Sequence, residues 1–296
     1  MRQRQRQRAP CHRLAGRHID AKLGQVTPHS REDSAGVAAA LLRAYDLRPD
    51  LCWPHLLIEF FSWLDVVAFA WFAMSWIAYS VAADLTRLRH RSVANVMNEY
   101  RVHWMVAMLQ RDLRIIDTSI VANVLHGVAF FTSTSILLVG GLVAGLGASD
   151  EAIAVISKLP LGVETSRASW DIKVLFMVAI FIYTFFKLAW SFRLFVNCSI
   201  LIGAAPLRPV PESVIRDYAN CVAHALNLAS RHNNAGMRAY FFALAAIWWF
   251  LNPLAFLVAT SVVVVVLYRR EFHSRTLRTI RDGLKISASV DDAEKS

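Results

Sequence analysis

Charged residues are scarce in this sequence, and their scarcity excludes most classes of soluble protein. They make up 18% of the 296 residues, whereas a soluble domain usually carries about a quarter. Hydrophobic residues make up 56%, the mean hydropathy is +0.39, and the apolar residues are gathered into long runs. Because such runs are typical of lipid-facing surface, the composition predicts an all-α, polytopic helical membrane protein.

The sequence also lacks the motifs of common enzymes. It contains no P-loop, no dinucleotide-binding glycine pattern, no nucleophile elbow and no HExxH. The four cysteines fit no zinc or redox spacing, so we expect free thiols at Cys11, Cys52, Cys198 and Cys221. No two of the histidines predicted to be cytoplasmic pair at i,i+4; these are His90, His103, His224 and His232. We therefore expect no enzymatic activity, no metal site and no cofactor.

The net charge of +10 would suggest nucleic acid as the partner of a soluble protein. Here no basic face with interleaved aromatic residues lies outside the apolar runs, so we expect no nucleic-acid partner. In membrane proteins, Arg and Lys collect on the cytoplasmic side and meet anionic lipid. The expected partners are therefore the lipid bilayer and anionic lipid headgroups, and homo-oligomerisation stays open.

Composition divides the chain into three segments. Residues 1–55 begin MRQRQRQR and mix charges with Gly, Pro, Ser and His, which predicts a disordered basic tail. No apolar stretch follows this start, so we expect no secretory signal peptide. Residues 56–282 form the predicted helical membrane domain, and residues 283–296 a disordered C-terminal tail.

Apolar runs predict the transmembrane helices. Three runs are long enough for a bilayer core of ~30 Å, which needs ~20 helical residues; they lie at 56–83, 117–147 and 172–205. The last apolar region, 239–268, is interpreted as two helices, because Asn252 is a strong N-cap and Pro253 suits the first helical position. A single Pro-kinked helix is the alternative there. The predicted bundle therefore has five, alternatively four, spans.

Two polar segments carry apolar residues at helical spacing and predict two cytoplasmic amphipathic helices. The stripe in residues 84–117 consists of Val93, Met97, Tyr100, Trp104 and Met108. The stripe in residues 213–231 consists of Val214, Tyr218, Cys221 or Val222, Ala225 and Leu228. The first helix either lies on the membrane surface or packs against neighbouring spans.

The distribution of arginine predicts the orientation. Residues 84–117 contain six Arg, whereas residues 148–171 contain one Lys and one Arg. The positive-inside rule places 84–117, 206–238 and the C-terminus in the cytoplasm, and 148–171 outside. For 206–238 and the C-terminus to share a side, the region between them has to cross twice, which agrees with a break at Asn252-Pro253.

Five strings resemble, as a set, the domain-of-unknown-function family number 599. They are RDLRIID at 111–117, FFTSTSILLVGG at 130–141, FFKLAWSFRLFVNCSILIGAAP at 185–206, GMRAYFFALAAIWWFLNP at 236–253, and VVLYRREFHSR at 265–275. The resemblance covers roughly residues 58–282. It implies a multispan membrane protein of bacterial or plant type, which we expect in the bacterial inner membrane. It supplies no activity, catalytic residue, substrate or cofactor.

Ionisable residues inside the predicted spans are candidate functional residues, because a charge there usually faces protein or water. They are Asp65, His126, Lys187 and Arg193. For Arg193 the alternative is snorkelling to the headgroups, and for Asp65 and His126 it is structural packing. Lys187 has no acid at i±3 or i±4, so we predict that it points toward the second span, near His126 or Asp117.

A charged cluster and a glycine pair complete the candidate sites. The cluster alternates in sign at the cytoplasmic mouth of the second span and comprises Arg111, Asp112, Arg114 and Asp117. It predicts either a salt-bridged junction or a site for a headgroup or anionic solute. Gly141 and Gly145 form a GxxxG pair, which can let another helix approach closely.

Two functional hypotheses remain. The first is a transport or permeation role for a small solute or ion, with Lys187, His126 and Asp65 along the path. The second is a non-catalytic membrane scaffold or assembly factor whose basic face binds anionic lipid. A polar cavity that reaches the middle of the membrane would favour the first hypothesis. A dry bundle with paired polar groups would favour the second.

Overall fold

A computed structural model describes residues 61–85, 92–159, 163, 165–207 and 209–295, which lie in one compact unit. The predicted tail at 1–55 lies outside these residues. The described residues form helices and no strand, which confirms the all-α class. The helices are α3 (Trp63–Leu85), α4 (Val93–Gln110), α5 (Ile115–Gly145), α6 (Ser149–Ile156), α7 (Arg167–Gly203), α8 (Glu212–Ile247), α9 (Pro253–Phe272) and α10 (Arg275–Lys295), with short 3-10 turns at Leu146–Ala148 and Trp248–Phe250.

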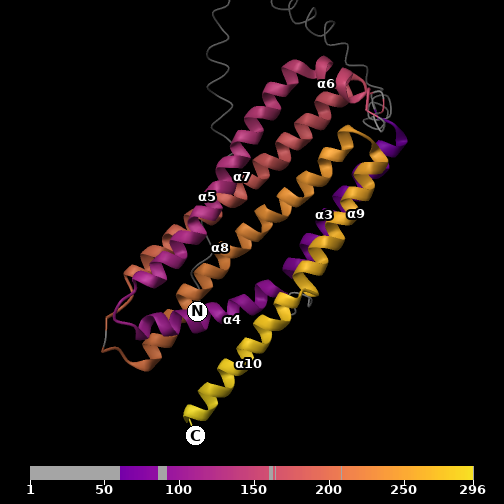
Figure 1. Ribbon diagram of the computed structural model, residues 1–296. Helices are drawn as coiled ribbons and strands as arrows, with labels where there is room; N and C mark the ends of the chain where they lie inside the picture. The colour runs from indigo at the N-terminus through magenta and orange to yellow at the C-terminus, as the bar shows by residue number, and fades with distance from the viewer. Residues whose placement is uncertain (1–60, 86–91, 160–162, 164, 208, 296) are drawn as a thin grey trace, which may run out of the picture. The chain divides into compact units, whose positions relative to one another are not determined.

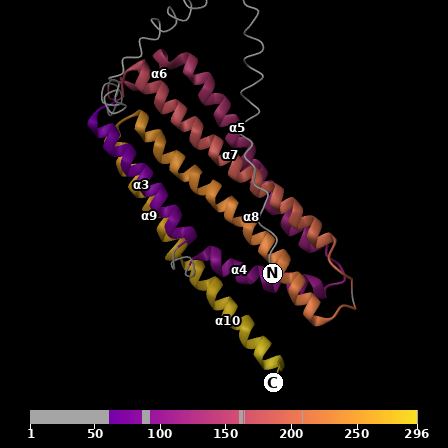
Figure 2. The same ribbon diagram turned by 180° about the vertical axis from the view of Figure 1, so that it is seen from behind.

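The long helices pack side by side as an up-and-down bundle. Figure 1 and Figure 2 show α5, α7 and α8 next to one another, with α3 and α9 paired along the other edge. One end of the bundle holds α6, the turn between α8 and α9, and the start of α3. The opposite end holds α4, which crosses α8 obliquely, and α10. The segments predicted to be cytoplasmic therefore share one end, and the segment predicted to be outside lies at the other.

Among the described residues, four segments are long and apolar enough to cross a membrane: Trp63–Asp84, Ile115–Ile156, Arg167–Gly203 and Pro253–Ile286. The protein is a multi-pass helical membrane protein. Helix α8 is not in this set, because the polar residues of its first half interrupt its apolar character. It nevertheless runs antiparallel to α7 and packs along it, so its placement supports the predicted fifth crossing.

The chain breaks between two helices where the sequence predicted it. The Asn252 side chain accepts a hydrogen bond of 2.8 Å from the backbone N–H of Leu254, and Pro253 is the first residue of α9. This N-cap separates α8 from α9, because Pro cannot continue the preceding helix. The two-helix interpretation of residues 239–268 is confirmed, and the Pro-kinked helix is wrong.

The second amphipathic segment, residues 213–231, is not a separate helix but the first part of the 36-residue α8. No strong helix breaker lies between 231 and 239, and Gly236 sits where α7 and α8 meet. A Cβ on Gly236 would lie 2.6 Å from Leu188 Cδ2, so the glycine permits the close approach. The predicted stripe is right in part: Val222 is buried and Tyr218 and Ala225 pack against the core, whereas Val214 and Leu228 are exposed. The other buried positions of this part of α8 are Ile215, Ala219, Ala223, Leu226 and Ala229.

Helix α4 forms within the first predicted amphipathic segment and packs against α8. Ser92 caps it by accepting a 3.1 Å hydrogen bond from the N–H of Asn95. Helix α10 runs through Lys295 and so includes residues 283–295 of the predicted C-terminal tail. Apolar residues at helical spacing, beginning with the buried Leu277, give α10 an apolar face. Tyr100 of α4 donates a 3.0 Å hydrogen bond to the carbonyl of Ile280 in α10.

Three apolar clusters fill the bundle, and the two larger ones form its cores. Near α4, the core is mainly aliphatic and contains Met105, Leu188, Phe195 and Val222. Near the α8–α9 turn, aromatic rings dominate, and Phe72, Phe242, Trp249 and Phe256 lie 5.1–5.6 Å apart between neighbouring ring centres. Because such rings pack with little free space, the second core closes that end of the bundle.

Candidate functional site

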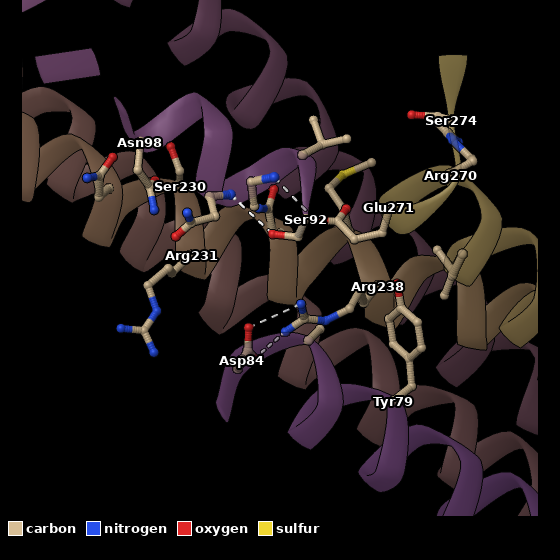
Figure 3. Close-up of a pocket in the computed structure, with 18 of the residues that line it drawn as sticks. Tyr79, Asp84, Ser92, Asn98, Ser230, Arg231, Arg238, Arg270, Glu271 and Ser274 are labelled. Carbon is tan, nitrogen blue, oxygen red and sulfur yellow. Dashed lines mark hydrogen bonds and ion pairs between the residues drawn. The ribbon is translucent and has the colours of Figure 1, made fainter. Parts of the chain in front are cut away.

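A cavity of about 590 Å³, with charged and amide side chains among its lining residues, opens at the α4 end of the bundle. Its walls come from the end of α3, from α4, from the middle of α8, and from the junction of α9 and α10 (Figure 3). Four arginines and two carboxylates line it, so its side chains carry a net positive charge. The lining also includes four asparagines, Asn95, Asn98, Asn227 and Asn234.

The acids of the cavity already have partners. Asp84 pairs with Arg238, whose two terminal nitrogens both donate to the carboxylate, and the two side chains face each other in Figure 3. Glu271 accepts a 3.3 Å hydrogen bond from the backbone N–H of Ala94, at the start of α4. These contacts join α3 to α8 and α9 to α4. The acids therefore hold the walls together.

Arg101 has no such partner. Its Nη1 donates hydrogen bonds of 2.9 Å to Asn98 Oδ1 and to Asn227 Oδ1, and no carboxylate in the described part of the chain forms an ion pair with it. Burial lowers the pKa of the guanidinium from its ordinary value, because removal from water penalises the charged form. The amide oxygens orient the guanidinium but do not neutralise it.

Arg101 also stands between two cavities. A second, smaller space of about 190 Å³ lies between α4, α5, α7 and α8, and Arg101, Ser230 and Asn234 line both spaces. The remaining cations differ in their surroundings: Arg231 is exposed and forms no ion pair with a described carboxylate, and Arg270 lies 5.8 Å from the ring centre of Phe241. Arg101 is thus the most enclosed positive charge of the cavity that lacks an acid.

The cavity extends inward as far as Tyr79, Phe241 and Leu267. Phe241 precedes Trp249 by eight residues, so it lies ~12 Å along the helix from the α8–α9 turn, at 1.5 Å per residue. The aromatic core occupies that distance. The cavity is therefore open at one end of the bundle and closed toward the other.

A buried ion pair lies beyond the aromatic core. Lys173 Nζ is 3.5 Å from Asp65 Oδ1, and the two side chains are only 5% and 12% exposed. Trp249 Nε1 donates a 2.7 Å hydrogen bond to Asp65, and Lys173 donates one of 3.2 Å to the Trp249 carbonyl. The pair joins α3, α7 and the α8–α9 turn. Asp65 was predicted as a candidate, but its partner Lys173 was missed, although both lie near the same end of their spans.

The other predicted intramembrane residues are not brought together. His126 and Arg193 are exposed, and neither forms a hydrogen bond or ion pair with a described residue. Lys187 is half-buried, with its ammonium 5.4 Å from the ring centre of Tyr183. Its Cβ would lie 3.5 Å from a Cβ on Gly236, so it faces α8. The prediction that Lys187 points toward His126 is wrong, because this side of α7 packs on α8.

The predicted charged cluster is a junction of helices. Asp117 is fully buried and accepts hydrogen bonds from Arg111 at 2.8 Å and from Trp104 at 2.7 Å. Arg114 donates to the carbonyls of Ala205 and Pro206 and thereby fixes the chain after α7. Asp112 is exposed. Of the two interpretations of this cluster, the geometry agrees with the salt-bridged junction.

The glycine pair does not pack against another described helix. Gly141 and Gly145 are exposed on α5, and a Cβ on either would meet no atom within 4 Å. The predicted helix contact is therefore absent between the described helices.

The sequence analysis did not identify Arg101 as a candidate residue. The available signal was that Asn98 and Arg101 both fall outside the apolar stripe of α4.

Comparison with known proteins places the chain in a family. The model of the family described as protein of unknown function DUF599 matches residues 67–276, so the chain belongs to that family. No curated protein matches, and no solved structure matches.

Proposed function

We propose that this member of a family of unknown function is a transport protein whose cavity admits a small anionic solute. The observation that carries the proposal is the charge of Arg101, which is oriented by two asparagines and has no acid among the described residues. A guanidinium presents a planar fork of donors that matches carboxylate and phosphate groups. A solute of that kind would neutralise Arg101 in a space where water screens charge poorly.

The depth of the cavity supports transport rather than surface binding. In a bilayer core of ~30 Å, a cavity whose inner wall lies ~12 Å from the opposite turn reaches beyond the middle. Arg231, at the open side, would attract anions before they enter. The open end is the one predicted to be cytoplasmic, so this conformation would receive solute from the cytoplasm.

Passage to the other side requires a second conformation. The aromatic core and the Asp65–Lys173 pair close the far end of the bundle. A transporter needs such a closed side, because a path open at both ends would dissipate gradients. We propose that the helix pair α3 and α9 moves against α5, α7 and α8, since the ion pair and the aromatic rings lie between these two groups.

Uptake into proteoliposomes tests the proposal. Vesicles with purified protein are compared with empty vesicles for labelled inorganic phosphate, succinate, chloride and the cation rubidium. We expect uptake of at least one oxyanion and none of rubidium. Arg101→Gln is expected to lower the rate at least tenfold, whereas Arg193→Gln, on the exposed face of α7, is expected to leave it unchanged. Equal uptake by the Arg101 variant and the wild type would overturn the assignment.

The alternative function is a non-catalytic scaffold that binds anionic lipid. One observation favours it: the half of the bundle near the α8–α9 turn is tightly packed, and its buried charges are paired. Under this alternative, no solute in the panel enters the vesicles. The same uptake experiment therefore separates the two functions.

A further inference from the structure

A third hollow, on the surface of the bundle, is apolar. It has a volume of about 420 Å³ and lies between α3 and α7, with Trp76, Ile77, Val81, Phe176 and Tyr183 among its lining residues. Ile77 is 65% exposed and Val81 43% exposed, so the groove opens to the outside of the bundle. Because α3 and α7 are both membrane-spanning segments, this outside is lipid.

The length of the groove matches one leaflet of a bilayer. On α3 its lining extends from Phe69 to Val81, which is ~18 Å at 1.5 Å per residue. Half of a hydrocarbon core of ~30 Å is about 15 Å. The groove ends one turn before Asp84, near the end of α3 and on the side predicted to be cytoplasmic. An acyl chain of the cytoplasmic leaflet would therefore run its length.

A cation without an acid lies at that end of the groove. Lys187 follows the lining residue Tyr183 by one helical turn and rests over its ring at 5.4 Å. No carboxylate in the described part of the chain pairs with it. Asp84, the nearest acid on α3, is already held by Arg238. On α8, His232 lies within electrostatic reach of Lys187 and of Arg231. Neither His232 nor Arg231 can supply the negative charge that Lys187 lacks.

We propose that this groove binds one anionic phospholipid, with an acyl chain along α3 and α7 and the phosphate at Lys187. A lysine in a span is costly when it faces only hydrocarbon, and a lipid phosphate supplies both the counter-charge and the hydrogen-bond acceptors that the described residues do not. The aromatic lining offers flat apolar surface to the chain. This site is separate from the cavity of Arg101 and does not rest on the proposed transport of a solute.

Native mass spectrometry of the full-length protein in detergent micelles tests the proposal, with phosphatidylglycerol or phosphatidylcholine of matched chains added. The wild type is expected to retain one phosphatidylglycerol and to lose phosphatidylcholine. Lys187→Met is expected to lower the retained fraction about fivefold, the contribution typical of one basic residue at an anionic surface, whereas Lys187→Arg should retain it. Ser80→Phe, which fills the groove but leaves the lysine, should also lower it.

Arg193→Met is the control, because Arg193 is exposed on the same helix and lines neither the groove nor the cavity. It should retain phosphatidylglycerol like the wild type. Equal retention by the wild type and Lys187→Met would overturn the proposal. So would an equal loss in Arg193→Met, which would show a general attraction of lipid to basic residues, or equal binding of phosphatidylcholine.

Discussion

Replacement of Lys173 by Met should destabilise the protein strongly, because it leaves Asp65 without its counter-charge in a nearly dry environment. The two side chains are 5% and 12% exposed, and their charged atoms are 3.5 Å apart. Removal of one partner from a buried ion pair typically costs about 3–5 kcal/mol. Asp65 would keep its hydrogen bonds from Trp249 Nε1 and from the Ser62 N–H, so we expect the lower end, about 3 kcal/mol.

Thermal unfolding in detergent, followed by the loss of monodisperse protein, measures this effect. A loss of about 3 kcal/mol corresponds to a fall in melting temperature of about 6–12 °C for a chain of this size class. The matched control is Arg167→Met, which removes an ion pair at 2.9 Å whose side chains are 58% and 72% exposed. Such an exposed pair contributes about 0–1 kcal/mol, so its loss should shift the melting temperature by no more than about 4 °C.

The double variant Lys173→Met with Asp65→Asn separates charge from packing. When both charges are absent, neither is left buried alone, so the double variant should be more stable than Lys173→Met. Two results would refute this reasoning. One is a Lys173→Met variant that melts with the Arg167→Met control, and the other is a double variant less stable than either single variant.

Two further predictions follow from the fold. Gly236→Leu should lower the free energy of unfolding by about 1–3 kcal/mol, because the new side chain overpacks against Leu188. Gly141→Leu should be tolerated, because no atom lies within 4 Å of its Cβ position. Equal melting temperatures for the two variants would contradict the close approach of α7 and α8. A cysteine at Asn252 should react with an impermeant maleimide from outside intact cells, and a cysteine at the exposed Asp112 only after permeabilisation; the reverse pattern would contradict the predicted orientation.

The parts of the fold that depend on local chemistry could be predicted from the sequence. The break at Asn252-Pro253 was recognisable because an N-cap and an N1 proline act within a few residues. The apolar runs located α3, α5, α7 and α9 because each run meets lipid. The helix of residues 93–110 was recognisable because its apolar side chains repeat at helical spacing.

The features that depend on contacts between distant segments could not be predicted in this way. Lys173 and Asp65 are 108 positions apart, and the packing of both α3 and α7 on the α8–α9 turn brings them together. Arg101 and Asn227 meet because α4 crosses α8. The glycines of α5 were predicted to form a helix contact but are exposed, because a GxxxG pattern does not indicate which face of a helix meets a neighbour.

The central claim is that Arg101 binds an anionic solute, and its most direct test is binding to the purified protein. An oxyanion identified by uptake is titrated into wild-type protein and into Arg101→Gln while the melting temperature is measured. Binding to the folded state at one hundred times the dissociation constant stabilises a protein by about 2.7 kcal/mol. We predict that the melting temperature of the wild type rises with concentration and saturates, and that the variant does not respond. An equal rise in both proteins would contradict the account.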